Sequence, residues 1–391
     1  MASRAPVACA STAVNDAVSS RSRQLFSYIT ASEDYAAPKA SMLADLIEHQ
    51  ILAQPPGAVF GLQADLARDL AIGRRLMRQA SRLLQERGLL TARRGGGGAG
   101  GLVSRAPDHH TVVLRLAATL HGGPVAAGIA DARALMPRLF ADADSPLARL
   151  MRDVIACLES NPSRLPDMEG GQAAQRLAVA LAEQHALGTR DSAPCFIGSL
   201  DTIADQAGTS LEVAVEAVRL LEERQLVVLT RGRGGGVHRA AGGAAQASRM
   251  CNAYLAGHGV SVAQCDAVLR AINIEMINLA CRRGAGKDQG DIQAALAAMA
   301  NAPRSTDLGL GWFLLQRSIA DLADSPVLHL FARCLSSSIV LRRLRSPDLP
   351  DAEARELLDA SVLITRNVSA GRITGNQRAH LRCQKALEGY W

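Results

Sequence analysis

Three arginine residues, Arg74, Arg75 and Arg78, begin a stretch of the chain in which apolar residues recur at helical spacing. An arginine side chain presents a planar fork of N–H donors that fits guanine O6 and N7 and also pairs with phosphate. Their spacing places all three in the first turns of one helix, where a DNA-reading helix contacts base edges. The grouping predicts binding to a polyanion, with double-stranded DNA as the partner.

Three helices and a hairpin are expected to position these arginines. Helical spacing of apolar residues over 43–51 ends at a Pro-Pro-Gly sequence, and a second, shorter pattern covers 62–70. After the turn at 71–73, the third pattern covers 74–87. A helix, a short turn and a second helix with a basic N-terminal end form the helix-turn-helix pattern.

A β-hairpin is expected directly after the third helix. Residues 89–92 and 102–104 can form two strands, and the glycine-rich stretch 95–101 can form the turn between them. Such a wing would place cations beside the DNA backbone phosphates. The residues predicted to contact DNA are Arg74, Arg75, Arg78, Arg93, Arg94 and Gly95.

The sequence LARDLAIGRRLMRQASRLLQERGLL, residues 66–90, resembles the GntR-family pattern LAxxLGVSRxxVRxALxxLxxxGLV over its whole length. It departs from that pattern at Ala71, Gly73 and Ser81. The resemblance implies a winged helix that binds operator DNA, with the family's contacts at Arg74, Arg78 and the Arg94-Gly95 wing tip. Because Gly73 has no hydroxyl group, one phosphate contact of the family is not expected.

An internal repeat is present. Residues 61–90 align without gaps on 198–227, with nine identities in thirty positions, and both copies continue into glycines. Asp144-Ser-Pro-Leu and Asp324-Ser-Pro-Val form a second, more widely spaced pair. The wider spacing predicts about two additional helices in the later copy. We interpret the chain as a duplicated winged-helix-plus-bundle unit whose first bundle is shortened.

The second winged helix is expected to pack or dimerise and not to read DNA. Leu211, Glu212 and Val215 occupy the positions of the three reading arginines, and a carboxylate there would repel phosphates. An auxiliary phosphate contact by this wing stays open, because it carries arginines. These are Arg231, Arg233 and Arg239.

Helical periodicity dominates after residue 245, and this region resembles the FCD effector domain that follows many GntR-type winged helices. The resemblance implies a helical bundle that binds a small organic ligand, in many members through a metal. The corresponding positions here are Trp312, Gln316, Ser361 and His380, so only one metal ligand remains and no metal is expected. An effector cavity lined by Trp312, Gln316 and His380 is one expectation, and a filled bundle used only for dimerisation is the other.

Composition narrows the classes of protein further. The chain of 391 residues carries a formal charge of +6. Its eight cysteines show neither a CxxC pair nor zinc-like spacing, and such scattered cysteines are typical of free thiols in a reducing cytoplasm. No apolar stretch reaches the roughly 18 residues of a membrane span. The nucleophile elbow, Walker loop and dinucleotide motif are missing, so neither an enzyme nor a bound cofactor is expected.

The predicted fold class is mostly α, with two winged helix-turn-helix modules, each with a small β-hairpin wing, and all-α helical bundle regions. The expected segments are a flexible tail at 1–35, the DNA-binding winged helix at 36–106, a shortened helical region at 107–172, a degenerate winged helix at 173–240 and the FCD-like effector and dimerisation domain at 245–391.

The sequence predicts a transcription regulator, a repressor by family-level expectation, that acts as a homodimer on a roughly palindromic operator and responds to a small organic effector. Two other interpretations stay open. One is a plasmid-type replication initiator, which also carries tandem winged helices. The other is a regulator that acts only through protein contacts and no longer binds DNA.

Overall fold

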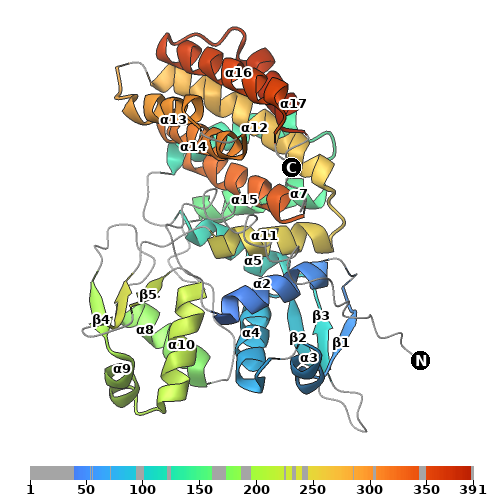
Figure 1. Ribbon diagram of the computed structural model, residues 1–391, viewed down its shortest axis with the longest axis vertical. Helices are drawn as coiled ribbons and strands as arrows, with labels where there is room; N and C mark the ends of the chain where they lie inside the picture. The colour runs from blue at the N-terminus through green and yellow to red at the C-terminus, as the bar shows by residue number, and fades with distance from the viewer. Residues whose placement is uncertain are drawn as a thin grey trace. The chain divides into compact units, whose positions relative to one another are not determined.

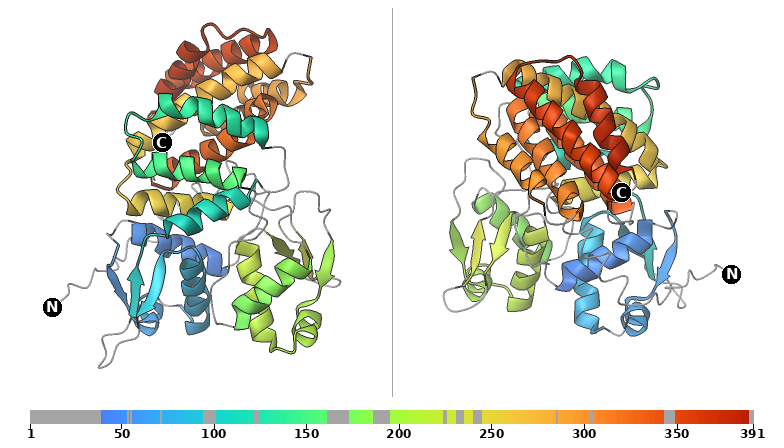
Figure 2. Two further views of the ribbon diagram at one scale, coloured as in Figure 1. Left: turned by 180° about the vertical axis from the view of Figure 1, so that it is seen from behind. Right: turned by 45° about the horizontal axis from the view of Figure 1, so that its top comes forward.

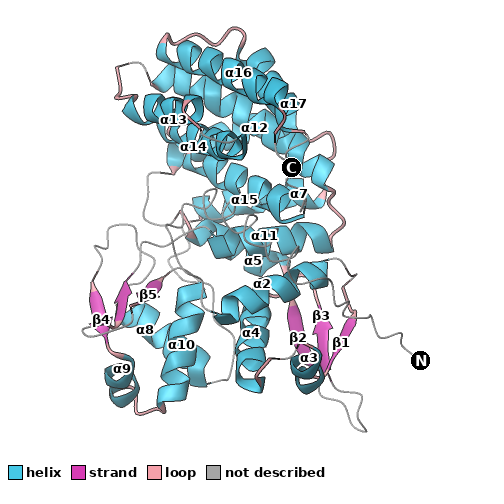
Figure 3. Ribbon diagram, in the orientation of Figure 1, coloured by secondary structure: helices cyan, strands magenta, loops and turns pink. Residues whose placement is uncertain are grey.

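The structure is a computed structural model (Figure 1). It describes residues 39–52, 54, 56–70, 72–93, 101–120, 125–160, 173–185, 195–223, 226–230, 235–239, 245–284, 286–302, 305–342 and 349–388. Within these ranges the chain is mostly helical, with 16 helices and two three-stranded antiparallel sheets, which confirms the predicted fold class (Figure 3). The tail predicted at 1–35 lies outside the described residues.

The first winged helix comprises α2 (Lys39–Leu52), β1 (Val59–Gly61), α3 (Gln63–Asp69), α4 (Arg74–Glu86), β2 (Leu90–Arg93) and β3 (Gly101–Ser104). Helix α4 buries Met77, Ala80 and Leu84, whose helical spacing forms one apolar face. The predicted helices and hairpin are therefore confirmed. Strand β1 was not predicted, and it completes a sheet of order β1-β3-β2.

The second winged helix repeats this arrangement with α8 (Ala173–Gln184), β4 (Phe196–Gly198), α9 (Leu200–Gln206), α10 (Leu211–Glu223), β5 (Val227–Leu229) and β6 (Val237–Arg239). Its sheet order, β4-β6-β5, is the counterpart of the first. A Cβ on Gly101 would lie 2.8 Å from the Gly61 carbonyl oxygen, and a Cβ on Gly236 would lie 2.8 Å from the Gly198 carbonyl oxygen. Both copies therefore need glycine where the outer strand crosses the central one.

The chain divides into two compact units. One unit holds both winged helices together with α5 (His109–Ala118) and α11 (Ala245–Gly257), and Figure 2 shows the two modules, in blue and green, side by side. The other unit is wholly helical in its described part. It contains α6 (Ala126–Leu139), α7 (Pro146–Glu159), α12 (Val262–Arg283), α13 (Gly290–Ala300), α14 (Ser305–Ala323), α15 (Pro326–Arg342), α16 (Asp351–Ser369) and α17 (Asn376–Leu387).

These units cut across the predicted segments. The region 107–172 is not a unit of its own, because α5 belongs with the winged helices while α6 and α7 belong with the C-terminal helices. Likewise, α11 of the segment 245–391 belongs with the winged helices. Helices α7 and α15 both begin at the proline of a Ser-Pro step. Two helices, α5 and α6, lie between the first hairpin and this step, and four, α11 to α14, lie between the second hairpin and its step, which confirms the two additional helices that the wider spacing predicted.

No helix in the described part of the chain is both long and apolar enough to cross a lipid bilayer.

Candidate nucleic-acid interface and ligand cavity

Helix α4 presents the three predicted arginines to solvent. Arg74, Arg75 and Arg78 are all exposed, and α4 has no acidic residue in its first turn. Gly73, at the N-cap, makes no side-chain hydrogen bond to the first-turn amides. The positive end of the helix dipole and the arginine charges therefore act together on an approaching anion.

Packing of the opposite face fixes the direction of these side chains. Met77, Ala80 and Leu84 are fully buried, and α4 packs on α2 and α3. Because residues three and four apart share a helix face, burying this stripe turns the N-terminal arginines outward. The exposed arginines are therefore on a rigid support.

A fourth arginine of α4, Arg82, is engaged within the protein. Its guanidinium forms an ion pair with Glu216 of α10. Burial, followed by the nearby charge of Arg78, lowers the pKa of Arg82. Arg82 therefore joins the two modules and is not part of the cationic surface.

The wing supplies one described cation. Strand β2 ends at Arg93, which is exposed, and pairs with Gly101 at the start of β3. Arg94 and Gly95, the other predicted wing contacts, lie outside the described residues. Arg93 thus sits at the described end of the hairpin.

A buried ion cluster fixes the base of α4, and the sequence analysis did not identify it. Arg87 Nη1 lies 2.9 Å from Asp45 Oδ1 and 2.5 Å from Glu48 Oε2, both on α2. Arg249 of α11 approaches the same two carboxylates at 3.1 and 3.3 Å. Two cations and two carboxylates balance one another in an environment where an unpaired charge would be costly. A signal was present in the sequence, since Asp45 and Glu48 are three residues apart on one helix.

The second module lacks the cationic surface. Leu211, 47% exposed, and the exposed Glu212 stand where the first module has Arg74 and Arg75. Arg239 donates a hydrogen bond to the His185 carbonyl oxygen within its own module. Arg231 and Arg233 lie outside the described residues.

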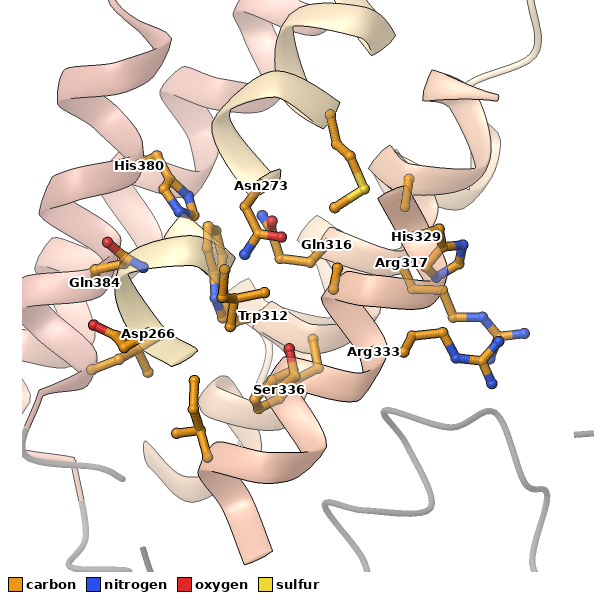
Figure 4. Close-up of a pocket in the computed structure, with 17 residues that line it drawn as sticks. Asp266, Asn273, Trp312, Gln316, Arg317, His329, Arg333, Ser336, His380 and Gln384 are labelled. Atoms are coloured by element: carbon orange, nitrogen blue, oxygen red, sulfur yellow. The ribbon is translucent and has the colours of Figure 1, made fainter. Parts of the chain in front are cut away.

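The helical unit contains a cavity of about 60 Å³ among α12, α14, α15 and α17. It brings together Trp312, Gln316 and His380, the three residues predicted to line an effector site (Figure 4). The rings of Trp312 and His380 stack with centroids 5.9 Å apart.

Several polar atoms at this cavity have no hydrogen-bond partner within the protein. They include both amide atoms of Gln316 and both ring nitrogens of His380. Burial, together with the nearby charge of Arg270, lowers the pKa of His380 to about 3, so the imidazole is neutral and offers one donor and one acceptor. A buried polar group without a partner costs about 1–3 kcal/mol, which a ligand with matching groups would recover.

The opposite end of the cavity is basic. Figure 4 shows Arg317, Arg333 and His329 together at this end, away from His380. His329 Nδ1 lies 3.7 Å from Asp321, and burial lowers the pKa of His329 to about 3, so the imidazole is neutral near pH 7. The arginines carry the positive charge that would attract an anionic group.

The four positions that the sequence resemblance compares with a metal site carry Trp312, Gln316, Ser361 and His380. Trp312 cannot ligate, Gln316 is a neutral amide, and the Ser361 hydroxyl donates to the Leu357 carbonyl oxygen. Among the described residues, no three His, Cys, Asp or Glu side chains gather closely enough to hold a metal ion.

Comparison with models of known protein families and with curated proteins finds no match to this chain.

Proposed function

We propose that this chain is a sequence-specific DNA-binding transcription regulator of the cytoplasm, a repressor by family resemblance, that reads double-stranded DNA through α4. The observation that carries the proposal is the exposed group Arg74, Arg75 and Arg78 at the N-terminal end of a rigidly packed second helix of a helix-turn-helix. Base recognition in the major groove uses this end of the helix and this side chain.

Each part of the first module has a separate role in this proposal. Arg74 and Arg78 contact base edges, with each bidentate arginine–guanine pair contributing about 1–3 kcal/mol of discrimination, and Arg75 beside them pairs with a backbone phosphate. Arg93 on the hairpin pairs with a backbone phosphate, which adds affinity but no sequence preference. The buried ion cluster at Arg87 keeps α2 and α4 in register, so that the reading end does not shift.

The test selects binding sequences from a library of duplexes with a random central segment. The wild-type protein is expected to enrich a defined motif, and Arg74→Ala/Arg78→Ala is expected to lose at least tenfold in affinity for it. The matched control is Arg149→Ala/Arg378→Ala, which removes two exposed arginines from the helical unit. Its net charge equals that of Arg74→Ala/Arg78→Ala. If no sequence is enriched, or if both double variants lose affinity equally, the arginines act only as general positive charge and the proposal fails.

We further propose that the cavity of the helical unit binds the controlling effector, a short organic acid that carries an amide or hydroxyl group. Gln316 and neutral His380 would take the hydrogen-bonding group, and the basic end at Arg317 and Arg333 would take the carboxylate. A ligand that favours one state of the regulator shifts its population by its difference in affinity for the two states.

Thermal unfolding in the presence of short hydroxy and amide carboxylates tests this second proposal. A binder at one hundred times its Kd is expected to stabilise the wild type by about 2.7 kcal/mol. Gln316→Leu removes both amide partners at nearly the same volume and is expected to abolish the shift. Arg149→Ala serves as the control. A shift that persists in Gln316→Leu would place the ligand elsewhere.

A further inference from the structure

The duplication in this chain extends beyond the winged helices. Strand β1 and helices α3 and α4 match β4, α9 and α10 element by element. Helix α5 corresponds to α11, because each is the first helix after its hairpin, and α7 corresponds to α15, because both begin at a Ser-Pro step. The matching glycine pairs Gly61/Gly101 and Gly198/Gly236 make the same close strand crossing in both copies. The chain therefore contains two copies of one arrangement. In each copy a winged helix, called a head below, is followed by its own helices.

Corresponding elements of the two copies contact one another. Helix α4 contacts α10, and α5 packs on α11, where His109 Nδ1 and the Tyr254 hydroxyl lie 2.9 Å apart. Contact of an element with its own equivalent is the signature of a two-fold, isologous interface.

The ion pair between α4 and α10 fits this description. Arg82 of α4 pairs with Glu216 of α10. By the repeat, Arg219 is the counterpart of Arg82, and Gln79 is the counterpart of Glu216. A symmetric interface would form the same arginine–carboxylate pair twice, once from each copy. Because only the second copy has the carboxylate, the pair forms once.

The two heads also differ in the property that DNA recognition depends on most. The first presents exposed Arg74, Arg75 and Arg78, and the second presents Leu211 and Glu212 at the first two of these positions. Binding to phosphates releases counterions only where cations replace them, so the second head contributes nothing comparable.

We infer that one chain is the complete DNA-reading unit, a covalently linked pair of heads of which one reads, and that its target is therefore an asymmetric DNA site bound by a single chain. This inference rests on the proposed function and replaces the expectation of a homodimer on a palindrome. Helix α10 packs against α4 of the same chain, where a dimer would place a second copy of the protein. The role of α10 is to hold the first head in position through the ion pair with Arg82.

The test uses the duplex enriched from the random library, with the full-length protein. The expected motif has no inverted repeat, and the complex contains one chain of 41.2 kDa per duplex by mass photometry. A duplex carrying the motif twice, as an inverted repeat, is expected to raise affinity by no more than the statistical factor of about two, because no second head engages cooperatively.

Variants of the two heads distinguish failure of the single-chain inference from failure of the proposed DNA-binding function. Glu212→Gln is expected to leave the enriched motif and the stoichiometry unchanged, whereas Arg74→Ala/Arg78→Ala removes specific binding at least tenfold. An inverted-repeat motif bound by two chains overturns the inference and leaves the proposed function intact. Failure to enrich any motif overturns the proposed function, and the inference with it.

Discussion

The two winged helices of this chain share a backbone and differ in their surfaces. Residues that pack or that must be glycine are equivalent, so α4 and α10 each bury an apolar stripe and each sheet crosses at a Gly–Gly contact. The exposed positions at the start of the reading helix have diverged completely. The comparison teaches that the fold depends on a few interior positions, while DNA recognition depends on exposed positions that can change without harming the fold.

A second difference lies in how each module is secured. The first has the buried cluster of Arg87 and Arg249 with Asp45 and Glu48. The buried residues of α8, the counterpart of α2, are all apolar: Ala174, Ala178, Leu181 and Ala182. The module that must hold cations in a fixed position is thus the one with the additional constraint at the base of its helix.

The largest effect expected concerns this cluster. Arg87→Leu leaves two buried carboxylates with fewer cations, which should lower the free energy of unfolding by about 3–5 kcal/mol. Urea unfolding followed by far-UV circular dichroism measures the change. The control is Arg68→Leu, which breaks an exposed ion pair with Asp65 and should cost below about 1 kcal/mol. Equal costs for the two variants would mean that the cluster does not hold the module.

The next effect is the pH dependence of stability in the helical unit, which can be measured separately from both winged helices. Because burial holds the pKa of His380 at about 3 in the folded protein, against about 6.5 when unfolded, the unfolded chain takes up a proton first as pH falls. Stability contributed by neutral His380 is therefore complete above pH 6.5 and declines between 6.5 and 3. From pH 6.5 to 4.5 the loss is about 2 kcal/mol.

Tryptophan fluorescence during urea unfolding measures this loss in the helical unit, since neither winged helix contains tryptophan. His380→Phe keeps an aromatic ring beside Trp312 and removes the titrating group. This variant should show a smaller decline in stability between pH 6.5 and 4.5 than the wild type. An unchanged decline would show that His380 does not titrate between its folded and unfolded states.

A smaller effect tests whether the two folds are equivalent. Gly101→Ala and Gly236→Ala each place a methyl group 2.8 Å from a carbonyl oxygen of the neighbouring strand. Overpacking of this kind costs about 1–3 kcal/mol, and the two variants should be destabilised by similar amounts in urea unfolding. A neutral result at Gly236 alone would mean that the second sheet has relaxed and no longer repeats the first.

Much of the fold could be predicted because it depends on local patterns. The apolar spacing of α4, the Pro-Pro-Gly stop after α2 and the spacing of the Ser-Pro steps at Ser145 and Ser325 all act within a few residues. The presence of two additional helices in the later copy followed from that spacing. Strand β1 was missed because its three residues, the last of which is Gly61, are too few to show a periodic pattern.

The division into units and the ion cluster could not be predicted, because both depend on contacts between distant residues. Nothing local to α5 indicates that it packs on α11. Arg249 looks like a solvated arginine until its partners on α2, about two hundred residues earlier, are known. Trp312, Gln316 and His380 were placed together by family resemblance, whereas the basic end of the same cavity, with Arg317, was not anticipated.

The smallest effect expected is a change in the salt dependence of DNA binding, which compares the two heads at equivalent positions. Arg75→Gln removes one cation from α4 and should reduce the slope of log K against log salt by about 0.9 on the selected duplex. Glu212→Gln removes one charge from α10 and should leave the slope unchanged, because that residue faces no phosphate. Fluorescence anisotropy from 50 to 300 mM salt measures both. A steeper slope in Glu212→Gln would mean that the carboxylate lies within a Debye length of the DNA, and that the second head lies at the DNA surface even though it does not read the sequence.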